Sequence, residues 1–272
     1  MRDAECATDM QPNAGLDDQA LILRMLEIYE VPSLAAWRAA EFRALAVPCE
    51  APILELGCGD GAFSDLLFAS VDCAVDLSSR ELRKLARRPG RRVACMDARY
   101  LGFGDQTFGT VFANCVLEHI EGLTLALSEC RRVLKPRGTL LATVPLAEMN
   151  GHLRLSAGWY SRLRAGQLRH VNLFTAPQWR RILIDHGFRD VRIRPYLGSR
   201  SCFLWDRLDS FFCLGVSWLR VGNAYKAGLR LFPEAMRTAV RRAWTRRCTE
   251  ILSGREAGAA CAGVLCARLP GG

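Results

Sequence analysis

Short apolar runs alternate with helical patterns between residues 51 and 145. Each run ends in a polar residue, and these residues are Glu55, Asp76, Asp97 and Asn114. A strand that is buried on both faces has such a continuous apolar run, and strands that alternate with helices are typical of a parallel sheet. The pattern therefore predicts an α/β fold.

A glycine-rich turn follows the first run, with Gly57, Gly59 and Gly61 at alternate positions. The helical pattern that starts at Ala62 places this turn at a helix N-terminus. Glycines let the backbone turn sharply and approach a ligand closely. The turn is one residue shorter than the glycine motif that binds dinucleotide pyrophosphates, which disfavours a nicotinamide-dependent dehydrogenase. A tight turn that binds no ligand is the alternative interpretation.

Two acidic residues after the turn have positions that suit a nucleoside. Asp76 lies 21 residues after Glu55. A carboxylate about 20 residues past a glycine-rich turn can accept hydrogen bonds from both hydroxyls of a ribose. Asp97, followed by Ala98, could hold the edge of a purine ring. For Asp97 the alternative is a solvated acid at the end of a strand.

Five segments, taken in their order and spacing, resemble the class I (Rossmann-like) S-adenosylmethionine-dependent methyltransferases, in the branch that acts mostly on small molecules and lipids. The resemblance covers residues 51–145 and implies a Rossmann-like sheet of seven strands, mostly parallel, with an antiparallel seventh strand between the fifth and the sixth. Asp60 and Gly109 depart from the family pattern, where a small hydroxyl residue and an acid are usual. The five segments are residues 55–61, 74–78, 96–98, 108–119 and 133–139.

The resemblance implies S-adenosylmethionine as the cofactor and assigns residues to it. Asp76 would accept the ribose hydroxyls, with Leu77 under the adenine. Asp97 would accept the adenine amine, and Ala98 would donate its backbone N–H. Glu55 would orient the glycine loop, whose backbone lies against the methionine and ribose portions. The full predicted set is Glu55, Gly57, Cys58, Gly59, Gly61, Asp76, Leu77, Asp97, Ala98 and, near the methionine portion, Asn114.

The predicted catalytic residues are His119, His170 and Tyr160. The family often has a histidine facing the cleft after the fourth strand, where His119 stands, and imidazole titrates near neutral pH. His170 and Tyr160 belong to the segment beyond the fifth strand, which lies at the mouth of the substrate site in related enzymes. The alternative for each is a packed or surface residue. An acceptor that is already nucleophilic at neutral pH needs no base.

The remaining sequence predicts elements on both sides of this core. Residues 17–46 have the pattern of one or two amphipathic helices, and a helix over 177–187 precedes strands at 188–196 and 260–269. The predicted organisation is N-terminal helices that cover the cofactor cleft (1–50), a methyltransferase core (51–196 and 259–272) and a helical insertion between strands six and seven (197–258).

The insertion is expected to emerge beside the active site, because the sixth strand is parallel to the first five and ends at the ligand-binding edge. Its first half has Leu204, Leu208, Phe211, Phe212 and Leu219 at helical spacing. Its second half begins at Pro233 and has Met236, Val240 and Trp244 on one face, with arginines around the remainder. We interpret the insertion as a lid or substrate-binding cap. A stabilising elaboration and a helix lying on a membrane surface are the alternatives.

Lysine and arginine exceed the acids by 37 to 28, and most of the surplus lies in the insertion. Such asymmetry can indicate nucleic acid, an anionic membrane or an anionic substrate, but a solvated helix face is the commonest cause. Peripheral membrane contact through residues 203–247 is therefore one hypothesis. A nucleic-acid partner is disfavoured, because the fourth strand ends in Asn114-Cys115-Val116-Leu117 without the Pro-Pro-aromatic clamp, and no RNA-binding module is recognisable.

Twelve cysteines include no C-x-x-C pair, and the four histidines do not combine with them at zinc spacing. We therefore expect no metal site, and we expect several cysteines to be buried in strands, as in a reducing cytoplasm. The N-terminal residues lack the apolar core of a signal peptide. The apolar stretch 202–221 is interrupted by charges, which excludes an ordinary membrane span.

The leading hypothesis is S-adenosylmethionine-dependent methyl transfer to a hydrophobic small molecule, such as a secondary metabolite, an isoprenoid or a lipid. The apolar, aromatic-rich insertion at the substrate edge favours it. The alternatives are a nucleic-acid methyltransferase and a cofactor-binding scaffold without methyl-transfer activity.

Overall fold

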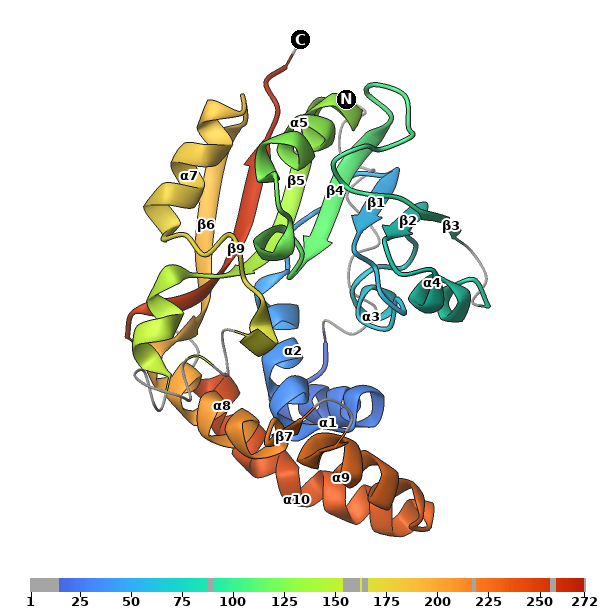
Figure 1. Cartoon of the computed structure of the whole chain (residues 1–272), viewed down its shortest axis with the longest axis vertical. Coiled ribbons are helices and arrows are strands. Elements are labelled where there is room, and N and C mark those ends of the chain that lie inside the picture. The colour runs from blue at the N-terminus through green and yellow to red at the C-terminus, as the bar shows by residue number, and fades with distance from the viewer. Residues whose placement is uncertain are drawn as a thin grey trace.

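A seven-stranded sheet forms the centre of the molecule (Figure 1). The structure is a computed structural model that describes residues 15–87, 91–153, 162, 166–216, 219–254 and 258–271. The sheet order is β3-β2-β1-β4-β5-β9-β6, and β9 runs antiparallel to both of its neighbours. The predicted Rossmann-like sheet with an antiparallel seventh strand is confirmed. Its strands are β1 (Ile53–Leu56), β2 (Cys73–Asp76), β3 (Arg92–Cys95), β4 (Phe108–Asn114), β5 (Leu134–Pro145), β6 (Arg189–Gly198) and β9 (Ala260–Arg268).

Two hydrophobic layers cover the two faces of the sheet. Successive residues of a strand point to opposite faces. On β4, Phe112 therefore joins the layer under α1 and α2, whereas Val111 and Ala113 join the layer under α5 and α7. This double burial explains the continuous apolar runs in the sequence. The helices outside the insertion are α1 (Asp18–Tyr29), α2 (Pro32–Ala44), α3 (Ser64–Leu67), α4 (Ser79–Leu85), α5 (Leu123–Val133) and α7 (Ala176–Asp185), with 3-10 turns η1 (Leu117–His119) and η2 (Ala147–His152).

Helix boundaries follow local capping chemistry. The Asp17 side chain accepts a hydrogen bond from the Ala20 backbone N–H at the start of α1, and a capping box joins Thr175 and Gln178 at the start of α7. Pro32 occupies the first position of α2, where its missing N–H costs nothing. The sequence predicts a break in the helical pattern near Val31-Pro32, and the structure confirms it.

Residues between β6 and β9 form a helical layer that lies against the N-terminal helices (Figure 1). The Trp205 ring centroid is 4.8 Å from that of Trp37 on α2, and the Cys248 thiol donates to the Pro32 carbonyl. None of the helices described in the chain is both long enough and apolar enough to cross a membrane. The elements of this layer are α8 (Ser199–Phe212), β7 (Gly215–Val216), β8 (Leu219–Arg220), α9 (Val221–Arg230) and α10 (Glu234–Ser253).

Two details of the insertion differ from the sequence prediction. Leu219 lies in the short strand β8, because a turn after Phe212 ends α8. On α10, Met236 is half exposed, whereas Arg241 is buried and its Nη1 lies 2.8 Å from Glu234 Oε1. The predicted apolar face of α10 is therefore wrong at its first turn, because the helix packs through its C-terminal half at Cys248, Ile251 and Leu252.

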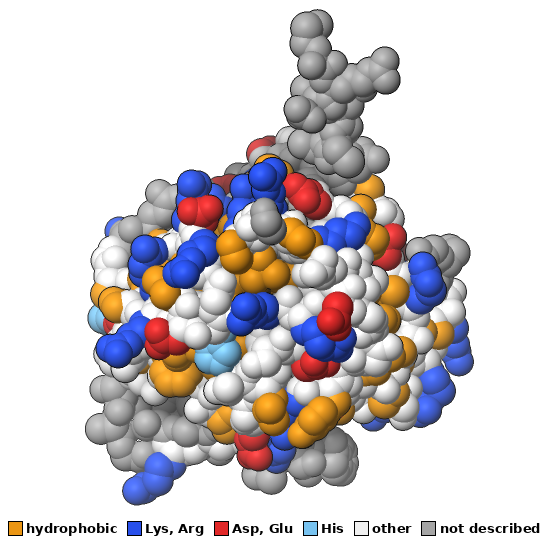
Figure 2. Space-filling model, turned by 90° about the horizontal axis from the view of Figure 1, so that it is seen from above, with side chains coloured by type: hydrophobic (Ala, Val, Ile, Leu, Met, Phe, Trp, Pro, Cys, Tyr) orange, Lys and Arg blue, Asp and Glu red, His pale blue; other side chains and the backbone are white. Residues whose placement is uncertain are grey.

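Basic side chains are dispersed over the face seen in Figure 2, which is the top of the molecule in Figure 1. Acidic and apolar side chains lie among them. The net charge of the chain is +9, but the basic side chains form no continuous patch among the described side chains of that face.

Candidate functional site

The glycine turn after β1 has a backbone that favours glycine. Gly57, Gly59 and Gly61 have φ angles of 62°, 54° and 72°, which side chains rarely permit. A Cβ at Gly57 would lie 2.4 Å from a methyl carbon of Val116, so the loop after β4 packs directly on this turn. A Cβ at Gly59 would meet no atom within 4 Å. The turn therefore presents open backbone next to the loop after β4, as a cofactor would require.

Asp76 ties the glycine turn to the end of β2. Its Oδ2 accepts a hydrogen bond from the Gly59 backbone N–H at 2.8 Å, and its Oδ1 accepts one from the Ser78 N–H at 2.7 Å. A carboxylate has about four lone-pair sites, so both oxygens can still accept from ribose hydroxyls. Leu77 is 71% exposed beside it. The structure thus places these two predicted residues together at the turn.

Glu55 lies beneath the turn and not on its open side. Its carboxylate is buried, and Oε2 lies 3.5 Å from Arg91 Nη1. Arg91 also bonds the Ser64 hydroxyl and pairs with Asp65. Burial raises the pKa of Glu55 to about 7, although Ser64 and Arg91 act in the opposite direction. This position suits the predicted role of orienting the loop.

Cys58 completes the predicted turn, where its backbone N–H donates to the Val75 carbonyl of β2 at 3.2 Å. The two positions that depart from the family pattern also have structural explanations. Asp60 Oδ1 accepts from the Ala62 backbone N–H at 3.1 Å, within the turn. At Gly109 a Cβ would lie 2.6 Å from the Glu50 carbonyl oxygen, which leaves no room for an acidic side chain.

Asp97 follows β3 and already has a cationic partner. Its Oδ2 lies 2.6 Å from Arg99 Nη2, and its Oδ1 accepts from the Arg99 backbone N–H at 2.9 Å. These hydrogen bonds lower the pKa of Asp97 below its usual value. An adenine amine at this carboxylate would share it with Arg99. Ala98 is half-buried next to it.

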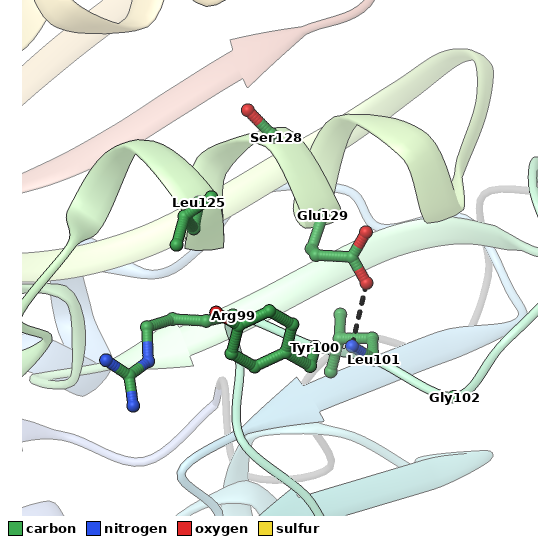
Figure 3. A pocket seen from close by; sticks show the side chains of 7 residues that line it. All are labelled: Arg99, Tyr100, Leu101, Gly102, Leu125, Ser128 and Glu129. Atoms are coloured by element: carbon green, nitrogen blue, oxygen red, sulfur yellow. Dashed lines mark hydrogen bonds between the residues drawn. The ribbon is translucent and has the colours of Figure 1, made fainter.

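A surface hollow of about 430 Å³ lies between the segment after β3 and α5 (Figure 3). In it, Glu129 accepts a hydrogen bond from the Leu101 backbone N–H at 2.7 Å and pairs with Arg132. The Arg99 guanidinium points away from Glu129. The Glu129 carboxylate is thus engaged with protein, and the lining of the hollow includes none of the predicted cofactor residues. Its lining residues are Arg99, Tyr100, Leu101, Gly102, Leu125, Ser128 and Glu129.

A buried carboxylate on α2, Glu41, fastens this helix to the sheet edge. Its Oε1 accepts from Trp37 Nε1 at 2.8 Å, from the Cys115 thiol at 2.9 Å and from the Tyr196 hydroxyl at 3.1 Å. Its Oε2 lies 2.6 Å from Arg38 Nη1. Asn114 joins the same network through Glu41 Oε2 at 3.5 Å and the Thr143 hydroxyl at 2.6 Å. Sequence reasoning missed Glu41, because it lies in a helical pattern without a motif.

The histidines predicted to be catalytic meet at the same edge of the sheet. The ring centroids of His119 and His170 are 5.1 Å apart, and His119 Nε2 lies 3.8 Å from Glu118 Oε1. The His119 side chain is 42% exposed, whereas Glu118 is buried. Burial raises the pKa of Glu118 to about 8. We call these three residues the Glu118 cluster. Tyr160 lies outside the described residues, and Glu118 was missed although it adjoins His119 in the sequence.

Comparison with known proteins agrees with this geometry. Residues 54–142 match a family model described as a methyltransferase domain. The malonyl-[acyl-carrier protein] O-methyltransferase of Methylococcus capsulatus is 33% identical over 159 residues, which are 54% of this chain and 54% of that protein. The chain thus spans about half the length of the curated relatives it matches.

Solved structures share the fold at low sequence identity. Phosphoethanolamine N-methyltransferase 2 of Haemonchus contortus, solved with S-adenosyl-L-methionine, is similar with a TM-score of 0.58 and 18% identity, over 95% of this chain and 58% of that chain. The [4+2]-cyclase SpnF gives a TM-score of 0.55 and 16% identity, over 94% of this chain and 97% of that chain. At these identities the similarity establishes the fold alone. Residues 54–142, which match the methyltransferase-domain model, thus have the sheet order and the glycine turn of the class I S-adenosylmethionine-dependent methyltransferase fold.

Proposed function

We propose that the protein transfers the methyl group of S-adenosylmethionine to a hydrophobic small molecule. The observation that carries the proposal is the contact of Val116 with the glycine turn at Gly57. It brings the exposed ring of His119, three residues later, close to the backbone that would hold the cofactor. The cofactor supplies an already activated methyl group, so the protein must chiefly position donor and acceptor.

The residues at the turn suit the donor. The open side of Gly59 can accept the methionine and ribose portions, and Asp76 can accept the ribose hydroxyls. Leu77 offers an exposed apolar side chain to the adenine, and Asp97 offers a carboxylate oxygen to its amine. Each assignment is a proposal that follows the family resemblance, residue by residue.

The insertion supports an apolar acceptor. Phe203, Phe211 and Leu214 are exposed apolar side chains on or just after α8. Gln167, three residues before His170, donates from Nε2 to the Cys213 carbonyl at the end of α8, at 3.4 Å. The insertion therefore touches the segment that carries His170. We propose that it acts as a cap over the acceptor, with His119 available to accept a proton if the acceptor needs a base.

The product class tests this proposal. The protein is incubated with S-adenosylmethionine that carries a labelled methyl group and with an extract of its own cells. Organic, aqueous small-molecule, nucleic-acid and protein fractions are then counted separately. We expect label in the organic fraction. Label in nucleic acid would instead indicate that the basic residues of the insertion bind phosphates, and it would overturn the proposal.

We also propose that the tip between α9 and α10, residues 231–233, binds to the surface of an anionic membrane without crossing it. Leu231 is 86% exposed there, and Phe232 and Met236 are also exposed. Arg230 adjoins this tip, and Arg242, Arg246 and Arg247 are exposed further along α10. Exposed apolar side chains flanked by basic ones are the features of a helix that lies on a membrane surface. A lipid-like acceptor would be delivered from such a surface.

A further inference from the structure

Three side chains with metal-binding groups meet in the Glu118 cluster. One ligand atom from each of Glu118, His119 and His170 lies within 4.8 Å of the other two. Glu118 is only 1% exposed, and its Oε2 makes no hydrogen bond. The nearest charges on α2, Arg38 and Glu41, form an ion pair with each other. A buried carboxylate oxygen that makes no hydrogen bond is costly, and coordination of a cation is one way to stabilise it.

The surrounding backbone fixes the His119 ring. Its Nδ1 lies 3.2 Å from the Arg169 carbonyl oxygen. A carbonyl can only accept, so Nδ1 carries a proton, and in the neutral ring Nε2 keeps its lone pair. Nε2 is the nitrogen that faces Glu118. Metal-binding histidines usually have this arrangement, in which the second ring nitrogen donates to a carbonyl or carboxylate.

Backbone hydrogen bonds also hold His170 in place. The N–H groups of Val171 and Asn172 both donate to the Glu118 carbonyl, at 2.8 and 3.0 Å. The Asn172 side chain donates to the carbonyls of Leu117 and Ile120, at 2.8 and 2.7 Å. The segment after residue 168 is therefore fastened to η1, and the proximity of the two histidines is built into the fold.

We propose that Glu118, His119 and His170 bind a divalent transition-metal ion beside the methyl-acceptor site. Two imidazoles and one carboxylate suit Mn²⁺, Fe²⁺, Co²⁺ or Zn²⁺, whereas Mg²⁺ and Ca²⁺ prefer oxygen ligands. Two atoms that are each about 2.1 Å from one ion lie at most about 4.2 Å apart. The three ligand atoms must therefore move closer together when an ion binds. The spacing of histidines and cysteines in the sequence gave no sign of this site, since its parts meet only in the fold.

Three protein ligands leave coordination positions open. Resting on the proposed function, we assign these positions to the acceptor, which is then a hydroxyl with a second oxygen close enough to chelate the ion. A cation lowers the pKa of a hydroxyl that it binds. His119 Nε2 is then bound to the ion and does not act as the base, so the hydroxyl releases its proton to water, and its oxygen forms the new bond to the methyl carbon. The electron pair of the broken carbon–sulfur bond stays on sulfur.

Binding of Co²⁺ to the whole, tag-free chain tests the site without any substrate. The chain is first treated with a chelator and then titrated, and the visible absorption of bound Co²⁺ is recorded. We expect one ion per chain. Affinity should fall at least tenfold in Glu118→Gln and in His170→Ala, while His152→Ala, which changes a histidine outside the cluster, should match the unchanged chain. Calorimetric titration with S-adenosylmethionine confirms that each variant is folded.

Two results would overturn the site: no stoichiometric Co²⁺ binding, or binding that Glu118→Gln and His170→Ala leave unchanged. The second result would assign the ion to other residues, such as the cysteines. Failure of the proposed function is distinguishable, because a chain that binds Co²⁺ through the cluster but transfers no labelled methyl group contradicts methyl transfer and leaves the metal site intact.

Discussion

At the scale of single residues, Asp76 connects two roles. It accepts hydrogen bonds from the backbone of the glycine turn and of the start of α4, and in the proposed complex it also accepts from the ribose. Its position at the end of a strand was predicted from the sequence, because strand ends and glycine turns have strong local signals. Its hydrogen bond to Gly59 was not, because it depends on the φ angles of the turn.

Replacing Asp76 with Ala should weaken S-adenosylmethionine binding by about 1.5–3 kcal/mol, the usual contribution of a hydrogen bond to a charged group. This corresponds to roughly a ten- to hundredfold higher Kd, which isothermal titration calorimetry would measure. Asp105→Ala is a suitable control, because that carboxylate is exposed and pairs with Arg132 away from the turn. Equal affinity of the Asp76 variant and the unchanged chain would disprove the ribose assignment.

The buried Glu55 carboxylate should make the free energy of unfolding depend on pH. Its pKa is raised from 4.5 to about 7 by burial, so the unfolded chain loses this proton at a lower pH than the folded chain. The contribution to stability is present below pH 4.5 and is lost as pH rises towards 7, with a total of roughly 3 kcal/mol. Glu55→Gln should remove this dependence. Urea denaturation of both proteins between pH 4.5 and 8 would show it, and parallel pH profiles would contradict it.

At the scale of elements, α2 is the helix most closely joined to the site. Through Glu41 it bonds residues at the ends of β4 and β6, and through Trp37 it packs on α8. The N-terminal helices and the core thus meet at one buried carboxylate, and the insertion packs on the Trp37 ring that donates to it. The sequence predicted the helix from its apolar spacing, but residues that meet across the fold leave no local pattern.

Glu41→Ala should destabilise the protein by about 3–5 kcal/mol, since it leaves the partly buried Arg38 and the buried Trp37 and Tyr196 donors without their partner. Chemical denaturation measures this difference. Glu27→Ala is the matched control on α1, because its ion pair with Arg24 is exposed and should contribute about 1 kcal/mol or less. If Glu41→Ala lowers the free energy of unfolding no more than Glu27→Ala does, the network does not hold α2 on the sheet.

Strand prediction succeeded where burial produces a continuous apolar run and was less accurate at irregular edges. The apolar run 92–96 predicts a strand, and β3 ends one residue earlier, at Cys95. The sequence predicts the fifth strand at 139–144, but β5 starts at Leu134, which pairs with Phe108 before a register shift. The segment that follows Leu134 contains Pro136 and Gly138, which are typical of the end of a helix. Only the neighbouring strand makes these residues part of the sheet, so their local sequence gives no signal for it.

At the scale of the whole molecule, the insertion extends away from the sheet, and the tip between α9 and α10 lies at the end of the molecule farthest from the C-terminus of β9 (Figure 1).

A double substitution of Leu231 and Phe232 by Ser should reduce binding to vesicles that contain anionic lipid, because the apolar side chains no longer insert into the lipid. Sedimentation with vesicles measures this effect. Leu125→Ser changes an exposed leucine on α5 and should have no effect. If the double variant binds vesicles like the unchanged chain, the tip is not a membrane contact.

Consumption of the cofactor tests the central claim, methyl transfer to a small molecule, most directly. The chain is incubated with S-adenosylmethionine and an organic extract of its own cells, and S-adenosylhomocysteine is quantified together with new methylated products by mass spectrometry. We predict that S-adenosylhomocysteine forms only when the extract is added, in equal amount to a methylated organic compound. Tight binding of S-adenosylmethionine without its consumption, in any extract fraction, would contradict methyl transfer and identify a cofactor-binding protein on the same fold.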